Sequence, residues 1–95
     1  MPAYWIGHVT VTDPTAYEGY RQANAVAFAK YDARFLVRGG CQEVVEGEIR
    51  PRTVVIEFPD LAAAQACYHS PEYQAAKDKR DGVSLADLCI VEGYL

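Results

Sequence analysis

Three side chains that could do chemistry together, His8, Arg38 and Glu57, lie in strand-like segments of the sequence. A guanidinium such as that of Arg38 can hold a carboxylate through two parallel hydrogen bonds. Glu57 could orient the imidazole of His8, which titrates near neutral pH and could act as a general acid or base. The other interpretation is an internal ion pair between Arg38 and Glu57 that fixes strand pairing or the register of a dimer, because structural ion pairs use the same residue types.

The segments that must position these side chains alternate between two periodicities. Runs of β-branched and aromatic residues predict strands, whereas apolar residues at steps of three and four predict helices. Strands are predicted at residues 3–12, 34–38, 52–58 and 85–95, with a further extended segment at 41–49 after a bulge or bend at Gly39–Gly40. Helices are predicted at 13–32, 60–69 and 70–81.

The expected helix starts carry residues suited to capping. Asp13 precedes Pro14, which has no N–H to leave unpaired in the first turn of a helix. Asp60 can cap the second helix, and Ser70 followed by Pro71 predicts a new start directly after it. The second helical region is therefore expected to be two consecutive helices with a kink near residue 70.

The order of strand, helix, two strands, helical region and strand is that of the split βαβ, ferredoxin-like pattern. We therefore expect an α+β fold with a ferredoxin-like βαββαβ antiparallel sheet and helices on one face, forming a single domain over residues 1–95. In that topology the first and third strands are central and the second lies beside the third. Alternation along the strands then places His8, Glu57 and Arg38 on one face, with Glu57 as the partner of Arg38.

The face that carries these polar groups is too apolar to remain in water. Its expected apolar members are Tyr4, Ile6, Leu36, Val55, Leu88 and Ile90. A contiguous apolar surface of this kind usually marks an interface, and two such sheets stacked face to face would bury it. The sequence therefore predicts a homodimer with these faces turned inward.

A stripe of tyrosines runs along the helical segments. Tyr17, Tyr20 and Tyr31 follow helical spacing on the first helix, and Tyr68 and Tyr73 lie on the second region. Such a stripe is most often core with hydroxyls reaching the rim, but it can also line a pocket. Tyr20 and Tyr68 are the two candidate ligand-binding tyrosines.

Composition excludes several classes of function. The net charge of −4 argues against nucleic-acid binding, and "KDKR" at 77–80 is interrupted by an acid and is interpreted as a solvated helix face. The cysteines Cys41, Cys67 and Cys89 form no C-x-x-C pair, which argues against zinc or a disulfide framework and favours a reducing cytoplasm. No apolar run reaches 18 residues, so no membrane partner is expected.

Three stretches, "FLVRGG", "RTVVIEFPDLAAAQACYHSPEYQAAKDKR" and "IVEGY", resemble the bacterial family called domain of unknown function 1330 over essentially the whole chain. The resemblance implies the dimeric α+β barrel, in which two ferredoxin-like sheets pack together. "YDARF" departs from the family, which often has glycines there. The family has no established activity and transfers no catalytic residue. The wider superfamily includes isomerases, cofactor-independent oxygenases and haem-handling proteins, and a shared fold transfers none of these functions.

The leading hypothesis is a cytoplasmic homodimer that binds a small organic anion in a cleft lined by Arg38, Glu57 and His8, with Tyr20 and Tyr68 as further candidates. The first alternative is an isomerase or oxygenase that needs no cofactor and acts on a small acidic or aromatic metabolite, with His8 and Glu57 as catalytic candidates. The second alternative is a purely structural or interaction domain. No metal or cofactor is expected.

Overall fold

The structure is a computed structural model and describes residues 1–94. Its elements follow the expected order: β1 (Ala3–Val11), α1 (Pro14–Lys30), β2 (Arg34–Arg38), β3 (Arg52–Phe58), α2 (Leu61–His69), α3 (Pro71–Asp78) and β4 (Ser84–Glu92). This confirms the ferredoxin-like α+β fold predicted from the sequence.

The helix starts use the caps that the sequence predicts. The side chains of Asp13 and Asp60 accept hydrogen bonds from backbone N–H groups three residues later. Ser70 ends α2 and starts α3, because its hydroxyl oxygen accepts from the N–H of Tyr73 at 3.1 Å while it donates to the carbonyl of Cys67 at 2.7 Å. The predicted kink at residue 70 is confirmed.

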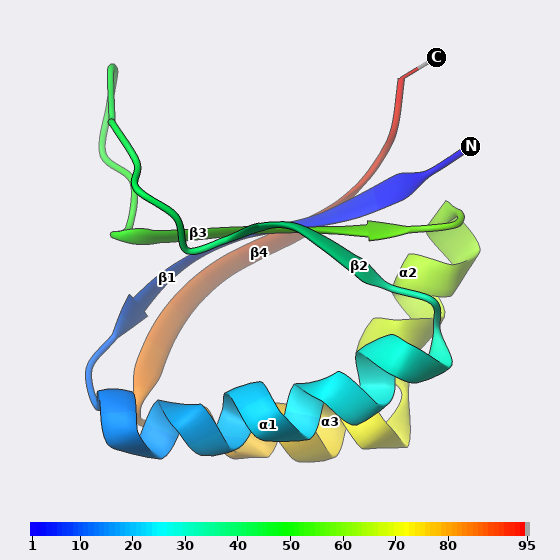
Figure 1. Cartoon of the computed structure of the whole chain (residues 1–95), viewed down its shortest axis with the longest axis horizontal. Helices are drawn as coiled ribbons and strands as arrows, with labels where there is room; N and C mark the ends of the chain where they lie inside the picture. The colour runs from blue at the N-terminus through cyan, green and yellow to red at the C-terminus, as the bar shows by residue number, and fades with distance from the viewer. Residues whose placement is uncertain (95) are drawn as a thin grey trace.

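The four strands form one antiparallel sheet in the order β2-β3-β1-β4. Figure 1 shows the three helices on one face of this curved sheet and a long connection, residues 39–51, rising from the other. We call this connection the β2–β3 arm. The extended segment expected at 41–49 lies within the arm and forms no strand.

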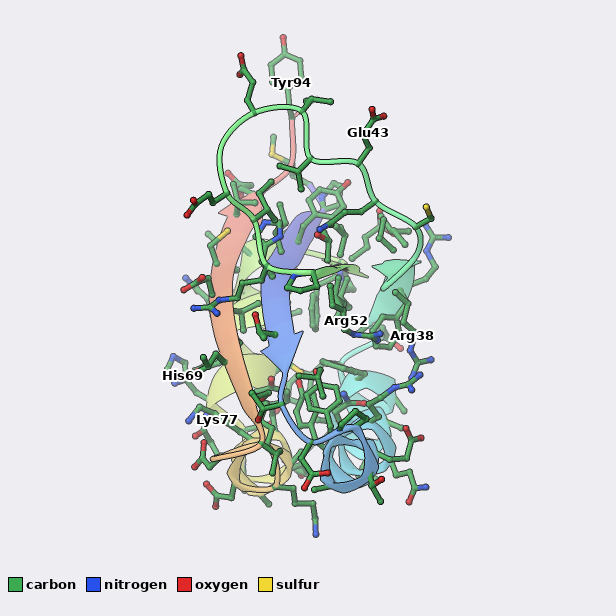
Figure 2. The ribbon with its side chains drawn as sticks, turned by 90° about the vertical axis from the view of Figure 1, so that its left-hand side faces the viewer. Arg38, Glu43, Arg52, His69, Lys77 and Tyr94 are labelled. Carbon is green, nitrogen blue, oxygen red and sulfur yellow. The ribbon has the colours of Figure 1, made fainter. Side chains whose placement is uncertain are left out.

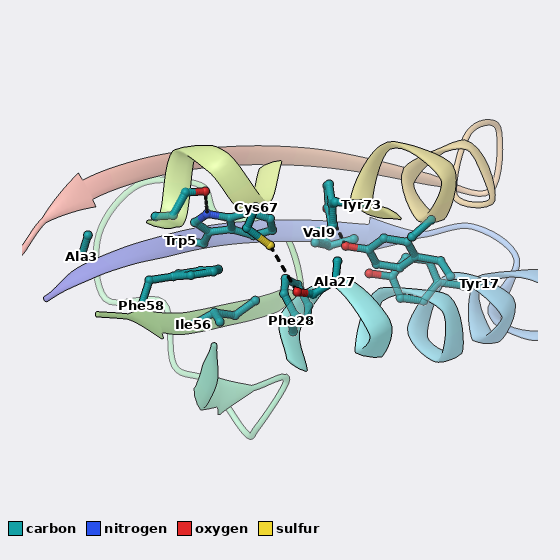
Figure 3. Close-up of a cluster of buried hydrophobic side chains, with 13 residues drawn as sticks. Ala3, Trp5, Val9, Tyr17, Ala27, Phe28, Ile56, Phe58, Cys67 and Tyr73 are labelled. Carbon is teal, nitrogen blue, oxygen red and sulfur yellow. Dashed lines mark hydrogen bonds between the residues drawn. The ribbon is translucent and has the colours of Figure 1, made fainter. Parts of the chain in front are cut away.

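The core lies between the helices and the sheet and is centred on Trp5 (Figure 3). The indole stacks edge-on against Phe28 and Tyr73, with ring centroids 5.3 and 4.8 Å apart. Its N–H donates to the carbonyl of Ala64 at 3.0 Å, so the polar atom of this side chain is satisfied. Cys67 is fully buried in the same core, and its thiol lies 3.9 Å from the carbonyl of Ala27.

The opposite face of the sheet carries apolar side chains that no helix covers. Its membership differs from the expectation, because β4 pairs with β1 so that Leu88 opposes Gly7 and Ile90 opposes Trp5, on the helix side. Leu85, Cys89 and Val91 lie on the uncovered face in their place and are exposed. The expectation for Leu88 and Ile90 was wrong because the parity of β4 could not be fixed before its register with β1 was known.

Two further features bear on the class of protein. No helix within residues 1–94 is long and apolar enough to cross a membrane. All three cysteines are unpaired: Cys67 is buried, and Cys41 and Cys89 are exposed.

Candidate functional site

Arg38 lies on the helix face of the sheet, opposite to the expectation. Arg34 pairs with Glu57 and Phe35 with Ile56, but the register then shifts, so that Val37 pairs with Val55 and Arg38 with Val54. A bulge adds one residue to a strand, and every residue beyond it points to the other face. The bulge lies in β2 itself, earlier than the Gly39–Gly40 position considered from the sequence.

The expected ion pair between Arg38 and Glu57 was therefore wrong. Glu57 accepts instead from Arg34, with Nη2 and Oε1 2.7 Å apart, on the uncovered face. Arg34 is largely exposed, so this pair contributes about 0–1 kcal/mol at most. Arg38 forms no salt bridge with any described residue, and its guanidinium lies 4.4 Å from the ring centroid of Phe35.

His8 lies on the uncovered face, at the base of the β2–β3 arm. The hydroxyl of Thr53 donates to Gln42 Oε1, so its oxygen accepts from Nδ1 of His8, 3.1 Å away. The amide of Gln42 donates to the carbonyl of Arg50 at 2.9 Å, and Arg50 in turn donates to Asp87 at 2.9 Å. These bonds attach the arm to the sheet, which is the structural role that the contacts of His8 support.

A pocket lies between the helices and the sheet, on the side where Arg38 points. Its apolar wall includes Trp5, Phe28, Phe35, Ile56 and Leu88. Its volume is about 590 Å³ including its open mouth, a size that suits a small ligand.

Four arginines from four different segments line this pocket: Arg21 from α1, Arg38 from β2, Arg52 from β3 and Arg80 from the turn after α3. Of these only Arg21 has an acidic partner in the described chain, Glu18, with Nη1 and Oε2 3.1 Å apart. No Asp, Glu, His or Lys is among the described residues that line the pocket. Burial also leaves the Nε atoms of Arg21, Arg52 and Arg80 without a hydrogen-bond partner. The site therefore presents positive charge and N–H donors that the described residues leave uncompensated.

Gly39 explains how Arg52 reaches the pocket. Figure 2 shows Arg38 and Arg52 close to each other beside β2, and both line the pocket. A Cβ at Gly39 would lie 2.2 Å from Nη1 of Arg52 and 2.7 Å from its Cζ, so the guanidinium occupies the space that a side chain would take. Gly39 also has a φ of 71°, which favours glycine. The "RGG" stretch thus supplies one pocket arginine and the space for another.

Three tyrosines, Tyr17, Tyr20 and Tyr73, line the helix side of the pocket. The hydroxyls of Tyr20 and Tyr73 are 2.7 Å apart and hydrogen-bonded (Figure 3). Burial and the neighbouring Tyr20 raise the pKa of Tyr73, so its phenol stays protonated at neutral pH. Burial and then Tyr20 likewise raise the pKa of Tyr17, against the opposing positive fields of Arg52, Arg80 and Arg21. Those three guanidiniums therefore act on one point of the pocket.

The structure separates the five residues that the sequence singled out. Arg38 and Tyr20 line the pocket, whereas His8 and Glu57 lie on the other face of the sheet. Tyr68 packs against Trp5, with ring centroids 5.8 Å apart, and lines a shallow neighbouring groove. Arg80 lies between the pocket and this groove, since it lines both.

Sequence reasoning missed Arg21, Arg52, Arg80 and Asn24 as pocket residues. Arg52 could have been found, because it continues the alternation of Val54, Ile56 and Phe58 by one step. The interpretation of "KDKR" as a solvated helix face was wrong for Arg80, because α3 ends at Asp78 and the turn directs Arg80 to within 5.5 Å of the ring centroid of Tyr20.

The site holds no cluster of metal ligands. Across residues 1–94, no group of three or more His, Cys, Asp or Glu side chains is arranged to hold a metal ion. What the pocket offers chemically is charge, hydrogen-bond donors and apolar contact area.

The fold and the pocket define a class: a ferredoxin-like α+β domain with a basic pocket between its helices and its sheet. The family model described as "Domain of unknown function (DUF1330)" matches residues 2–94. The chain therefore belongs to this family, as the resemblance in its sequence suggested. No curated protein matches it significantly.

Solved structures share the fold at low sequence identity. A protein of unknown function from Rhodopseudomonas palustris superposes with a TM-score of 0.80 at 17% identity, covering 99% of this chain and 83% of that one. SnoaB, a cofactor-independent oxygenase from Streptomyces nogalater, gives 0.67 at 14% identity, covering 99% and 94%. A dimeric protein of unknown function with a ferredoxin-like fold from Bacteroides fragilis gives 0.64 at 14%, covering 97% and 96%. At these identities the likeness extends to the fold alone.

Proposed function

We propose that this protein binds a small organic anion in the pocket between its helices and its sheet. The observation that carries the proposal is the set of three arginines, Arg38, Arg52 and Arg80, that line the pocket without an acidic partner among residues 1–94. Like charges in a partly buried site repel one another unless an opposite charge joins them. In a chain whose net charge is −4, this concentration of positive charge favours an anionic ligand.

The apolar wall favours an organic ligand over a simple inorganic ion. The rings of Trp5, Phe28 and Phe35 form much of it, and small-molecule sites typically combine such surfaces with a few polar groups. The guanidiniums can each hold a carboxylate through two hydrogen bonds, and the hydroxyl of Tyr20 can donate another. A small carboxylic acid with an apolar body fits this combination.

Binding has more support than proton transfer. A general base must lie within hydrogen-bond reach of the proton that it removes. His8 and Glu57, the catalytic candidates from the sequence, lie on the opposite face of the sheet from the pocket. The alternative of an isomerase or oxygenase that needs no cofactor therefore lacks a carboxylate or imidazole base among the described residues that line the pocket.

The test compares two arginines on the same strand. Arg38→Gln removes a guanidinium from the pocket, and Arg34→Gln removes one from the other face as a matched control. In a thermal-shift screen of small carboxylic and phenolic acids, a ligand at about 100 times its Kd should add about 2.7 kcal/mol of stability to the wild type. A lost charge-assisted bond is worth about 1.5–3 kcal/mol, so Arg38→Gln should weaken binding by about 10- to 100-fold.

Two results would contradict the proposal. One is a screen in which no acid stabilises the wild-type protein. The other is an acid that binds equally well to Arg38→Gln and Arg34→Gln in isothermal titration calorimetry, because binding would then lie outside the pocket.

We also propose that two copies pack through their uncovered sheet faces. This face carries Leu36 on one edge strand, β2, and Leu85 and Val91 on the other, β4, each more than 40% exposed, while the helices pack on the opposite face. A second copy is the occupant that this surface favours, because an isologous interface buries the same patch on both partners. The β2–β3 arm rises from the same face (Figure 1), and its exposed residues Val45 and Ile49 could extend the contact.

Sedimentation velocity tests this assembly with two substitutions on opposite faces. Leu85→Glu places a charge in the proposed interface and should convert a dimer to a monomer. Val26→Glu places the same charge at an equally exposed position on α1 and should leave the dimer intact. A wild-type monomer, or a dimer that tolerates Leu85→Glu but not Val26→Glu, would contradict it.

We propose a cytoplasmic location on the basis of the cysteines. Cys41 and Cys89 are exposed and unpaired, and an oxidising compartment would promote their pairing with other thiols. Titration of free thiols in protein freshly isolated from its native source, against its denatured form, tests this. Three free thiols per chain are expected in the denatured protein, with Cys67 unreactive until the chain unfolds, and a disulfide-linked species would argue against a cytoplasmic location.

A further inference from the structure

Asn24 is a buried polar side chain in the wall of the pocket. It lies on α1, is 5% exposed and lines the pocket. Its Oδ1 atom is fully buried and has no hydrogen-bond partner among the described residues. Buried side-chain oxygens nearly always have a partner, and an unsatisfied one is destabilising. The amide therefore indicates a partner other than the described residues.

The position of Asn24 shows where that hydrogen-bond partner must lie. On α1 it follows Tyr20 by four residues and Arg21 by three, so the three side chains lie on neighbouring parts of one helix face. All three line the pocket. A leucine of similar size would fill the same space without an unsatisfied atom. The group that meets the amide of Asn24 is thus inside the pocket, beside the residues that would bind an anion.

We propose that Asn24 hydrogen-bonds to a hydroxyl group of the bound anion, so that the ligand is a small hydroxy acid. This inference rests on the proposed function, because it concerns the same pocket. A carboxylate would accept from the arginines, while the hydroxyl donates to Oδ1 of Asn24. A hydroxyl can both donate and accept, so it satisfies the amide in either orientation. The aromatic wall would contact the carbon body between the two groups.

A bound water is the competing partner, since the pocket is large enough to hold one. A water partner and a ligand hydroxyl predict different selectivity among acids. If water satisfies Asn24, an acid with a hydroxyl binds no more tightly than the same acid without it. If the ligand satisfies Asn24, the acid lacking the hydroxyl leaves the amide unpaired and binds more weakly.

Isothermal titration calorimetry on matched acids separates these outcomes. The pairs are succinate and malate, propionate and lactate, and benzoate and 3-hydroxybenzoate. In the wild type, the hydroxylated member of at least one pair should bind about tenfold more tightly, the ratio expected for one well-made hydrogen bond. In Asn24→Leu this preference should fall below about twofold.

Controls keep the test independent of folding and of the proposed function. Asn24→Leu should melt no lower than the wild type, because it removes an unsatisfied buried atom, and Asn24→Ala serves if leucine does not fit. Gln22→Leu, an exposed amide on the same helix, should keep the preference. Acids that bind in an Arg38-dependent manner without any hydroxyl preference, or with a preference that survives in Asn24→Leu, overturn this inference and leave the proposed function intact. No binding by any acid overturns both.

Discussion

Gly39→Ala should separate the backbone role of this glycine from its role in placing Arg52. A Cβ there would lie 2.2 Å from Nη1 of Arg52, which is the flexible end of a long side chain. The guanidinium can move away at little energetic cost, so the clash displaces it from the pocket more than it destabilises the fold. The destabilisation comes instead from the φ of 71°, where alanine is strained by about 1–2 kcal/mol.

These two effects have different readouts. The strain should lower Tm by about 4–8 °C for each kcal/mol in a domain of this size. Displacement of the guanidinium should weaken binding of the best acid by about tenfold or more, the effect of a lost charge-assisted hydrogen bond. Differential scanning fluorimetry measures the first effect, and calorimetry at a temperature where both proteins are folded measures the second.

Gly40→Ala is the matched control. Its Cβ would meet nothing within 4 Å, and its φ lies outside the left-handed region. It should change neither Tm nor affinity. If Gly39→Ala melts early but binds the acid as tightly as Gly40→Ala does, Arg52 does not act in binding from this position. If both variants have the same Tm as the wild type, the claim that alanine is strained at the φ of Gly39 is refuted.

Two further predictions concern the buried groups around the pocket and core. Burial raises the pKa of the Cys67 thiol to about 12 from 9.0, so the folded state keeps its proton while the unfolded chain loses it. The free energy of unfolding should therefore be unaffected by this thiol below pH 9 and fall by up to about 1.4 kcal/mol per pH unit as the pH rises from 9 to 12. Urea titrations at several pH values should show that the free energy of unfolding of Cys67→Ala declines less steeply with pH than that of the wild type. Identical slopes in the two proteins would contradict this prediction. Tyr20→Phe leaves the hydroxyl of Tyr73 without its 2.7 Å partner and should lower the free energy of unfolding by about 1–3 kcal/mol, whereas Tyr94→Phe, at 99% exposure, should not change it.

The fold could be predicted from the sequence because its signals are local and agree with one another. Asp13 with Pro14, and Ser70 with Pro71, mark helix starts whose chemistry does not depend on distant residues. The alternation of β1 and β3 is regular, so their faces and the strand order followed correctly. The β2–β3 arm has β-branched residues but no neighbouring strand to pair with, which is why its extended pattern gave no strand.

The candidate site was harder to predict because it depends on one extra residue in β2. Face assignments assume an unbroken register, and the bulge between Phe35 and Val37 reverses the direction of Arg38. A bulge of this kind is defined by how β2 pairs with β3, a strand about twenty residues further along the chain, so the pattern within β2 does not show it. The place of Arg80 in the pocket could not be predicted for another reason: the direction of its side chain depends on where α3 ends.

Trp5 provides the most direct test of the central claim, that the arginine pocket binds a small organic anion. It is the only tryptophan of the chain and lines the pocket, so its fluorescence reports occupancy without depending on stability. Titration with malate and lactate, which do not absorb where indole is excited, should give a saturable change in the wild type and in Arg34→Gln. The midpoint should move to at least tenfold higher concentration in Arg38→Gln. A signal that never changes with any acid up to the millimolar range, or curves that coincide in all three proteins, would contradict the account.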